Sequence, residues 1–260
     1  MNAQTHGSLT ETPIFPVSGE IMRHDVDAEQ LAAQNVFGFR KADHRARAFK
    51  LLRSQIIKRC EEDGLKMIGV TSAAPGVGKS FVAANLAAAL SRIGQLDICL
   101  VDLDLHRPAL GTRFSVSEGP GMHDFLAGNV PDLGQVARRI NDENLVLLPG
   151  FKREVATGEL LTGINGDRLF AGLRALPPST LVIVDMPPIF ADDDAVIIGQ
   201  RIDGFMLVVE DGRTTQKQAR DTIRVLQPTP LIGTVLNRYR NQLFSDDYGY
   251  GFSYGYGAYY

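Results

Sequence analysis

The chain has 260 residues, of which 44% are hydrophobic, and a formal net charge of −3 at pH 7. This length and composition suffice to bury one large core, so we expect a single principal domain with short appendages. The near-neutral charge gives no global reason to expect nucleic acid as a partner. Two cysteines, Cys60 and Cys99, are too few for a disulfide framework or a zinc site and are typical of reduced thiols in a cytoplasmic protein.

The first 38 residues mix proline, glycine and polar residues without a sustained period, which predicts a flexible leader with a short helix near residues 28–35. No charged start and apolar run of a secretory signal is present, and no stretch approaches the ~18 apolar residues that span a bilayer. We therefore expect any membrane association to come through a partner.

Residues 43–62 predict an amphipathic helix, because Phe49, Leu52 and Ile56 fall on one helical face. The other faces are basic, since the segment 40–59 contains eight lysines and arginines against a single acid. This basic helix could contact another subunit, anionic lipid or an acidic partner, or it could be an ordinary solvated face.

Six short apolar runs follow, and helical patterns separate them. Unbroken rather than alternating apolar runs are typical of strands that are covered on both faces. The order predicts a doubly wound α/β domain with a mainly parallel sheet, over residues 39–240, in which ligands bind at the carboxyl ends of the strands. The runs cover 66–72, 97–104, 144–149, 180–186, 204–210 and 231–237, and helical patterns cover 81–94, 166–176 and 214–226.

The first run leads into TSAAPGVGKS (71–80), which has the features of a phosphate-binding loop followed by a helix. Glycines let backbone N–H groups face a phosphate, Lys79 adds a positive charge, and the Ser80 hydroxyl can bind Mg²⁺. The G-x-x-x-x-G-K-[ST] pattern has its first glycine where this chain has Ala73. We expect the nucleotide to contact Ala74, Pro75, Gly76, Val77, Gly78, Lys79, Ser80 and Phe81.

Three acids lie at the predicted carboxyl ends of strands. The run DICLVDLDLHRP carries Asp102 and Asp104, and LVIVDMPP carries Asp185. Phosphoryl transfer needs carboxylates that hold a metal ion or its waters and a base for the attacking hydroxyl, so we expect Lys79 and these acids to be catalytic. The alternative is that such an aspartate only caps the next turn.

Motifs of the eukaryotic protein kinases are missing, because HRP stands where HRD would be and no DFG occurs. The predicted fold is therefore that of a P-loop NTPase. It permits ATP hydrolysis, a nucleotide-dependent switch, or transfer to a protein hydroxyl.

Six of the seven tyrosines lie in the last 13 residues, interleaved with four glycines. This composition predicts a mobile tail over 241–260, with a reach of ~25 Å. A sticky aromatic tail for weak association is the alternative. The tyrosines are Tyr248, Tyr250, Tyr254, Tyr256, Tyr259 and Tyr260.

The order APGVGKS, VDLDLHRP, VIVDMPP and a C-terminal tyrosine cluster resembles the bacterial tyrosine kinases of exopolysaccharide and capsule synthesis, over residues 43–260. In that family the three motifs are Walker A, Walker A′ and Walker B, and the tyrosine cluster is autophosphorylated. The resemblance implies that Lys79 and Ser80 bind phosphate and Mg²⁺, that Asp102 is the base toward the tyrosine, and that Asp104 and Asp185 organise the metal.

The resemblance also implies ATP and Mg²⁺ as cofactors and an adenine contact by Asn237. It implies self-association, a transmembrane co-polymerase-type adaptor at the inner membrane and a phosphotyrosine phosphatase as partners. Family members carry E-x-x-R-x-x-R before the first strand, and here the segment RAFKLLR keeps the basic positions without the glutamate. The rival interpretation is a MinD- or ParA-like ATPase switch without kinase activity. Against it, Ala74 stands where those relatives have a lysine.

Overall fold

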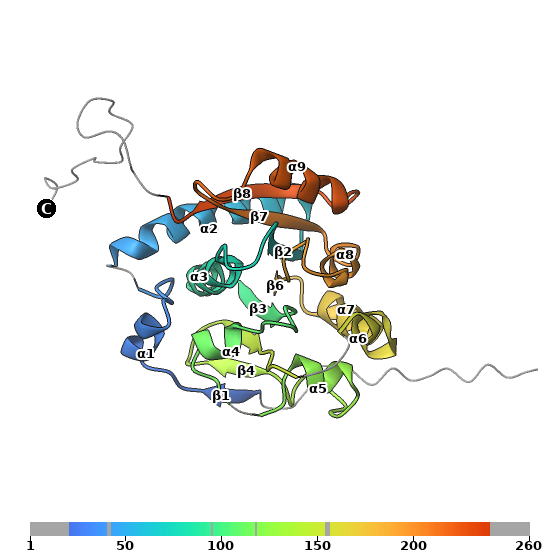
Figure 1. The fold of residues 1–260 in the computed structure, drawn as a ribbon. Coiled ribbons are helices and arrows are strands. Elements are labelled where there is room, and N and C mark those ends of the chain that lie inside the picture. The colour runs from blue at the N-terminus through green and yellow to red at the C-terminus, as the bar shows by residue number, and fades with distance from the viewer. Residues whose placement is uncertain (1–20, 41–42, 95, 118, 154–156, 240–260) are drawn as a thin grey trace, which may run out of the picture.

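The computed structural model describes residues 21–40, 43–94, 96–117, 119–153 and 157–239. Its centre is one eight-stranded sheet in the order β1-β4-β5-β3-β6-β2-β7-β8 (Figure 1). Every neighbouring pair is parallel except β4 and β5, which are antiparallel. The strands are β1 (Met22–His24), β2 (Met67–Ser72), β3 (Asp97–Asp102), β4 (Arg138–Ile140), β5 (Leu145–Leu148), β6 (Thr180–Asp185), β7 (Gly204–Glu210) and β8 (Leu231–Asn237).

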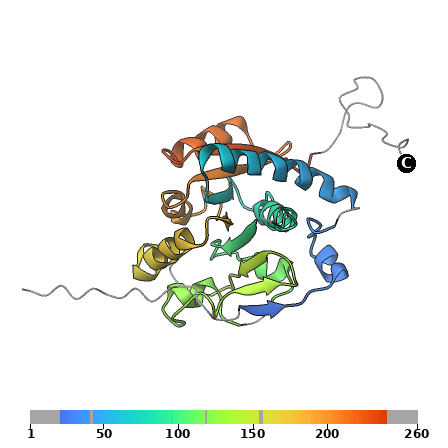
Figure 2. The same cartoon turned by 180° about the vertical axis from the view of Figure 1, so that it is seen from behind.

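Helices cover both faces of the sheet (Figures 1 and 2). None that the structure describes is long and apolar enough to cross a bilayer. The helices are α1 (Ala28–Ala33), η1 (His44–Ala46), α2 (Arg47–Asp63), α3 (Lys79–Ser91), α4 (Leu110–Arg113), α5 (Met122–Leu126), α6 (Thr157–Thr162), α7 (Ile164–Ala175), α8 (Asp194–Gly199) and α9 (Gln216–Val225).

Successive residues of the central strands enter two different cores. In β3, Ile98 and Leu100 pack with α2 and α3, whereas Cys99 and Val101 pack with α5, α7 and α8. Both faces of each central strand are therefore apolar, which explains the unbroken runs in the sequence. The predicted fold class is confirmed, as are all six predicted strands and the helices predicted near 28–35 and over 43–62, 81–94, 166–176 and 214–226.

The boundary of the leader at residue 38 needs a correction. Residues 22–24 form β1, which pairs with β4 at the edge of the sheet, and the leader residues Val26, Leu31, Val36 and Phe37 are buried. The sequence MRH has no apolar run, so nothing local predicts a strand there. Tertiary contacts hold this segment in place, since the backbone of Val26 hydrogen-bonds both ways with the Asn141 side chain at 2.8 and 3.0 Å.

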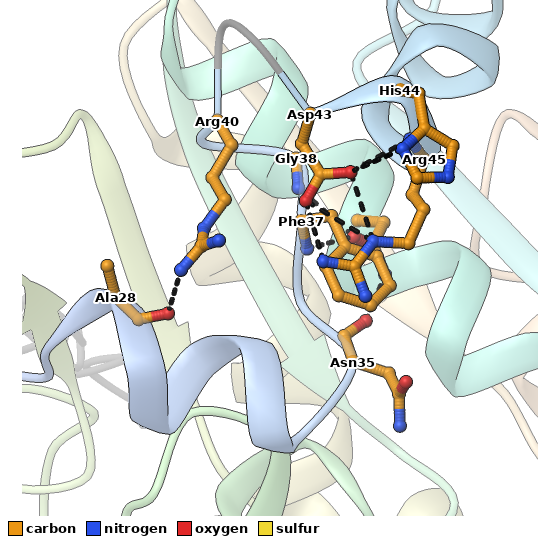
Figure 3. Close-up of polar contacts among 9 residues, drawn as sticks. Ala28, Asn35, Phe37, Gly38, Arg40, Asp43, His44 and Arg45 are labelled. Carbon is orange, nitrogen blue, oxygen red and sulfur yellow. Dashed lines mark hydrogen bonds and ion pairs between the residues drawn. The ribbon is translucent and has the colours of Figure 1, made fainter.

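The segment from α1 to α2 crosses helix α3, where the buried side chain of Asn85 holds it. Asn85 accepts the N–H groups of Phe37 at 2.6 Å and Gly38 at 3.1 Å, and it donates to the carbonyl of Asn35 at 2.8 Å. Figure 3 shows these three residues beside Arg45, whose guanidinium lies 3.8 Å from the centre of the Phe37 ring. The crossing is therefore fixed by polar and aromatic contacts together.

Replacement of Gly38 by alanine should destabilise the fold, because the new Cβ would lie 2.3 Å from the backbone oxygen of Asn85 and 2.7 Å from the Ala88 side chain. We expect a loss of at least about 2 kcal/mol in the free energy of unfolding, measured by urea denaturation. Gly94→Ala is the control, since a Cβ there meets nothing within 4 Å. Equal effects of the two substitutions would contradict the tight crossing.

Candidate active site

The loop between β2 and α3 has the geometry of an anion cradle. Gly76 and Gly78 adopt left-handed backbone angles, with φ of 78° and 101°. Helix α3 begins at Lys79, and its N-cap Gly78 makes no side-chain capping bond. Since the first N–H groups of a helix have no acceptor within the helix, the N-terminus of α3 can bind phosphate.

Gly78 is also a point of close approach between the loop and the last strand. A Cβ at this position would lie 2.2 Å from Nδ2 of Asn237, and that same nitrogen donates a 2.8 Å hydrogen bond to the carbonyl of Val77. Asn237 therefore supports the phosphate loop directly. The predicted contact between Asn237 and adenine stays a prediction.

Two further positions of the predicted phosphate loop are Ala73, where the sequence pattern has a glycine, and Phe81, a predicted nucleotide contact. Ala73 is buried and is not among the described residues with positive φ, so its backbone conformation does not require glycine. The Phe81 ring packs edge-on against Phe49, with ring centres 5.5 Å apart. Its side chain thus belongs to the α2–α3 contact, and the predicted contact of Phe81 with the nucleotide stays a prediction.

The structure brings Lys79 and the three predicted acids together in one buried cluster. Asp102 and Asp185 are paired neighbours on β3 and β6 and are both fully buried, and Asp104 is 2% exposed. The Lys79 ammonium forms an ion pair with Asp104 and lies 4.0 Å from Asp185 Oδ1. The Ser80 hydroxyl is 3.4 Å from Lys79 Nζ, so the predicted metal-binding hydroxyl borders the same cluster.

The two carboxylate oxygens of Asp102 differ, because one caps a helix and the other accepts no hydrogen bond from the described residues. Its Oδ2 accepts the N–H groups of Ala109 at 3.0 Å and Leu110 at 2.9 Å, which caps the start of α4. Among the described residues its Oδ1 is buried without a hydrogen-bond partner, and neither oxygen of Asp185 has a partner within hydrogen-bond distance, although Lys79 lies 4.0 Å from Asp185 Oδ1. Buried carboxylate oxygens without donors are costly, so this cluster is suited to a ligand that supplies cations or hydrogen-bond donors.

These residues fit Mg²⁺ bound together with a nucleotide. Within the described ranges, no three His, Cys, Asp or Glu side chains form a metal cluster by themselves. This agrees with the chemistry of Mg²⁺, which proteins usually hold through one or two carboxylates plus substrate phosphates and water. Ser80, Asp104 and Asp185 are the candidates, and the phosphate oxygens would complete the shell.

Burial and the neighbouring charges change the pKa values of Asp102, Asp185 and Lys79. Burial, with the nearby charge of Asp185, raises the pKa of Asp102 to about 8. Burial also raises the pKa of Asp185 to about 6, although Lys79 opposes the shift. Burial alone would lower the pKa of Lys79, but Asp185 and Asp104 outweigh it and the net direction is upward. A charged lysine therefore lies beside two carboxyl groups, Asp102 and Asp185, whose protonated forms burial favours.

Sequence reasoning missed two parts of this region. Arg113 reaches across the Phe81 ring at 5.8 Å and donates to the backbone of Gln34 at 3.1 Å. His106, two residues after Asp104, contacts Thr157 and the acids that follow β6. The run of three aspartates at 192–194 was the one available signal for the second contact. The six candidate phosphoacceptor tyrosines lie outside the described residues.

The raised pKa of Asp102 predicts a pH dependence of stability. The folded protein binds this proton more tightly than the unfolded chain does, so stability without nucleotide should fall as the pH rises from about 4 to about 8. Asp102→Asn keeps an oxygen for the N–H groups of Ala109 and Leu110 and has no proton to lose. The variant should be about 1–3 kcal/mol more stable than the wild type at pH 8 and similar to it near pH 4.5.

Urea unfolding between pH 4.5 and 8.5 measures this difference. The matched control is Asp97→Asn, since Asp97 is exposed at the opposite end of the same strand. Wild-type and Asp102→Asn stabilities that run parallel across the whole range would show that Asp102 does not carry the shift.

Comparison with known proteins agrees with this geometry. A model of the CobQ/CobB/MinD/ParA nucleotide-binding domain matches residues 68–248. The chain is 30% identical to the tyrosine-protein kinase YwqD of Bacillus subtilis over 204 residues, which is 78% of this chain and 84% of YwqD. It is 33% identical to EpsB of Ralstonia solanacearum over 80% of this chain, but it spans only 27% of the length of EpsB.

Among solved structures, the kinase domain of the Escherichia coli tyrosine kinase ETK is similar, with a TM-score of 0.70 and 27% identity. The likeness covers 82% of this chain and 84% of that domain. The fold is thus shared with a bacterial tyrosine kinase domain. The chain belongs to the CobQ/CobB/MinD/ParA nucleotide-binding domain family and, within it, to the bacterial tyrosine-protein kinases.

Proposed function

We propose that the chain is an ATP-dependent protein-tyrosine autokinase that phosphorylates its own C-terminal tyrosines in trans. The observation that carries the proposal is the buried cluster of Lys79 with Asp102, Asp104 and Asp185 at the end of the phosphate loop. The cluster supplies the charges that phosphoryl transfer needs. The relatives named as tyrosine-protein kinases support tyrosine as the acceptor.

Lys79 and Asp102 act directly on the reacting groups in this proposal, and Asp104 and Asp185 are the candidate metal-organising acids. The N–H groups at the start of α3 and the Lys79 ammonium bind the terminal phosphates, and Mg²⁺, when bound, neutralises charge on their oxygens. The tyrosine oxygen attacks the γ-phosphorus, the bond between that phosphorus and the β–γ bridging oxygen breaks, and ADP leaves. Asp102 accepts the phenolic proton through Oδ1, the oxygen that has no hydrogen-bond partner among the described residues. A base with a pKa near the working pH suits this transfer.

The wider role follows the same proposal. We assign the kinase to the control of polysaccharide polymerisation and export, at the inner membrane and together with a transmembrane co-polymerase-type adaptor and a phosphotyrosine phosphatase. Phosphorylation adds about 1.5 to 2 negative charges per tyrosine, and charge of this size could loosen a homo-oligomer.

Replacement of Lys79 should remove the kinase reaction. In the presence of γ-labelled ATP and Mg²⁺, the wild type should incorporate label on tyrosine, and Lys79→Met should incorporate at least about 100-fold less. Lys217→Met is the control, because Lys217 is exposed on α9 and pairs only with Asp221 on the same helix in the described structure. ATP hydrolysis by the wild type without any labelled tyrosine would instead support the MinD- or ParA-like switch.

A mixing experiment tests transfer between molecules. A chain that ends at Ser245 keeps the catalytic cluster but lacks all six candidate tyrosines, and full-length Lys79→Met keeps the tyrosines without the lysine. Incubated together with γ-labelled ATP, the two should place label on the Lys79→Met chain, whereas each alone should stay unlabelled. An unlabelled mixture, with an active full-length wild type, would mean that transfer occurs within one molecule.

A further inference from the structure

At the carboxyl edge of the sheet, the ends of β3 and β6 and the connections that follow them are linked at two points, an inner one through Lys79 at the start of α3 and an outer one by direct contact. The first connection, residues 103–109 after β3, carries Asp104 and His106, and the second connection, residues 186–193 after β6, follows Asp185. At the inner point, Lys79 pairs with Asp104 and lies 4.0 Å from Asp185. At the outer point, His106 Nε2 lies 3.3 Å from Asp192 Oδ2 and 3.5 Å from Asp194 Oδ2.

The outer point is anchored in the protein interior. Thr157 begins α6 and is 3% exposed, and Asp194 begins α8 and is fully buried. The Thr157 hydroxyl donates to Asp194 Oδ2 at 2.5 Å and lies 2.7 Å from His106 Nε2. Since the hydroxyl proton is engaged, the Thr157 oxygen accepts from the His106 ring, which must carry a proton on Nε2. The chain Asp194–Thr157–His106 thus ends on the turn that bears Asp104.

This turn is compact enough to transmit the position of His106 to Asp104. The N–H of Arg107 donates to both the backbone oxygen and the Oδ1 of Asp104, each at 3.1 Å. His106 lies inside the loop that these bonds close. His106 and the Asp104 carboxylate are therefore parts of one hydrogen-bonded turn.

The inner contact competes with a bound nucleotide for the same ammonium. Lys79 pairs with Asp104, and Lys79 is also the candidate partner of the terminal phosphates. Once Lys79 turns to them, Asp104 loses its partner at the moment when its carboxylate must serve the metal. The outer contact is independent of Lys79 and remains.

We propose that Thr157 is a positioning residue, which acts through His106 and is held by Asp194, and that it keeps Asp104 in place for Mg²⁺ after Lys79 has moved to the phosphates. The inference rests on the proposed function of Asp104 as a metal-organising residue. It assigns a role to buried polar groups for which the fold alone gives no need, since an apolar residue would fill the position of Thr157 without a buried hydroxyl.

The test is the effect of Mg²⁺ on ADP affinity, measured by calorimetry with full-length protein. Thr157→Val keeps the shape of the side chain and removes the hydroxyl. We expect this variant to bind ADP without metal as the wild type does, and to lose about tenfold of the gain in affinity that Mg²⁺ gives. Thr162→Val is the matched control, because Thr162 is exposed on the same helix and its hydroxyl bonds only to backbone oxygens of α6 in the described structure.

Two further variants separate positioning from folding. Thr157→Ser retains the hydroxyl and should restore the Mg²⁺ effect. If Thr157→Val fails to fold, His106→Ala gives the same test at a half-exposed side chain, and it should show the same tenfold loss. Tyrosine labelling should fall in Thr157→Val at low Mg²⁺ and recover as Mg²⁺ is raised.

An unchanged Mg²⁺ effect in Thr157→Val and in His106→Ala would overturn the inference. Its failure is distinct from failure of the proposed function. If the wild type labels its tyrosines while Thr157→Val and His106→Ala keep the full Mg²⁺ effect, the proposed kinase function is supported and the positioning role is refuted. A wild type that binds Mg²⁺·ADP but labels no tyrosine removes the kinase, and a tenfold loss in Thr157→Val would still support the positioning of Asp104.

Discussion

The contact between Lys79 and the buried carboxyl groups is the constraint on which the rest of the structure depends. Register between β3 and β6 sets Asp102 directly beside Asp185, so two acids are forced together away from water. A single lysine faces them and Asp104. Such a cluster opposes folding unless protons or a ligand compensate it, and the raised pKa values of Asp102 and Asp185 express that cost.

The fold keeps this unfavourable cluster rigid by surrounding it with well-packed apolar layers. The central strands are covered on both sides, and α3 is buried along nearly its whole length, with Val82, Leu86 and Leu90 inside the core. The side chain of Asn85 then ties the segment before α2 to the same helix. The stability that these apolar layers provide offsets the electrostatic cost of the buried carboxyl groups at their edge.

The phosphate loop, the three acids and the six main strands could be predicted because a local sequence pattern indicates each of them. Walker-type spacing and unbroken apolar runs are local patterns, and the parallel topology then brings Asp102, Asp104 and Asp185 together. The chain from His106 through Thr157 to Asp194 could not be predicted in this way, because its members are separated by dozens of residues and no local spacing relates them. β1 escaped prediction for a related reason, since only its pairing with β4 makes the polar segment 22–24 a strand.

The hydrogen bond between Asn237 and Val77 joins the end of the last strand to the nucleotide loop. Asn237 closes β8, and the described chain ends two residues later at Tyr239. The backbone oxygen of Asn237 also accepts the N–H of Asp211 at 3.2 Å, and Asn237 pairs with Glu210 of β7. One residue therefore fixes the end of the last strand to the neighbouring strand β7 and to the predicted phosphate loop at once, so a change in the position of Asn237 would alter the backbone of that loop at Val77.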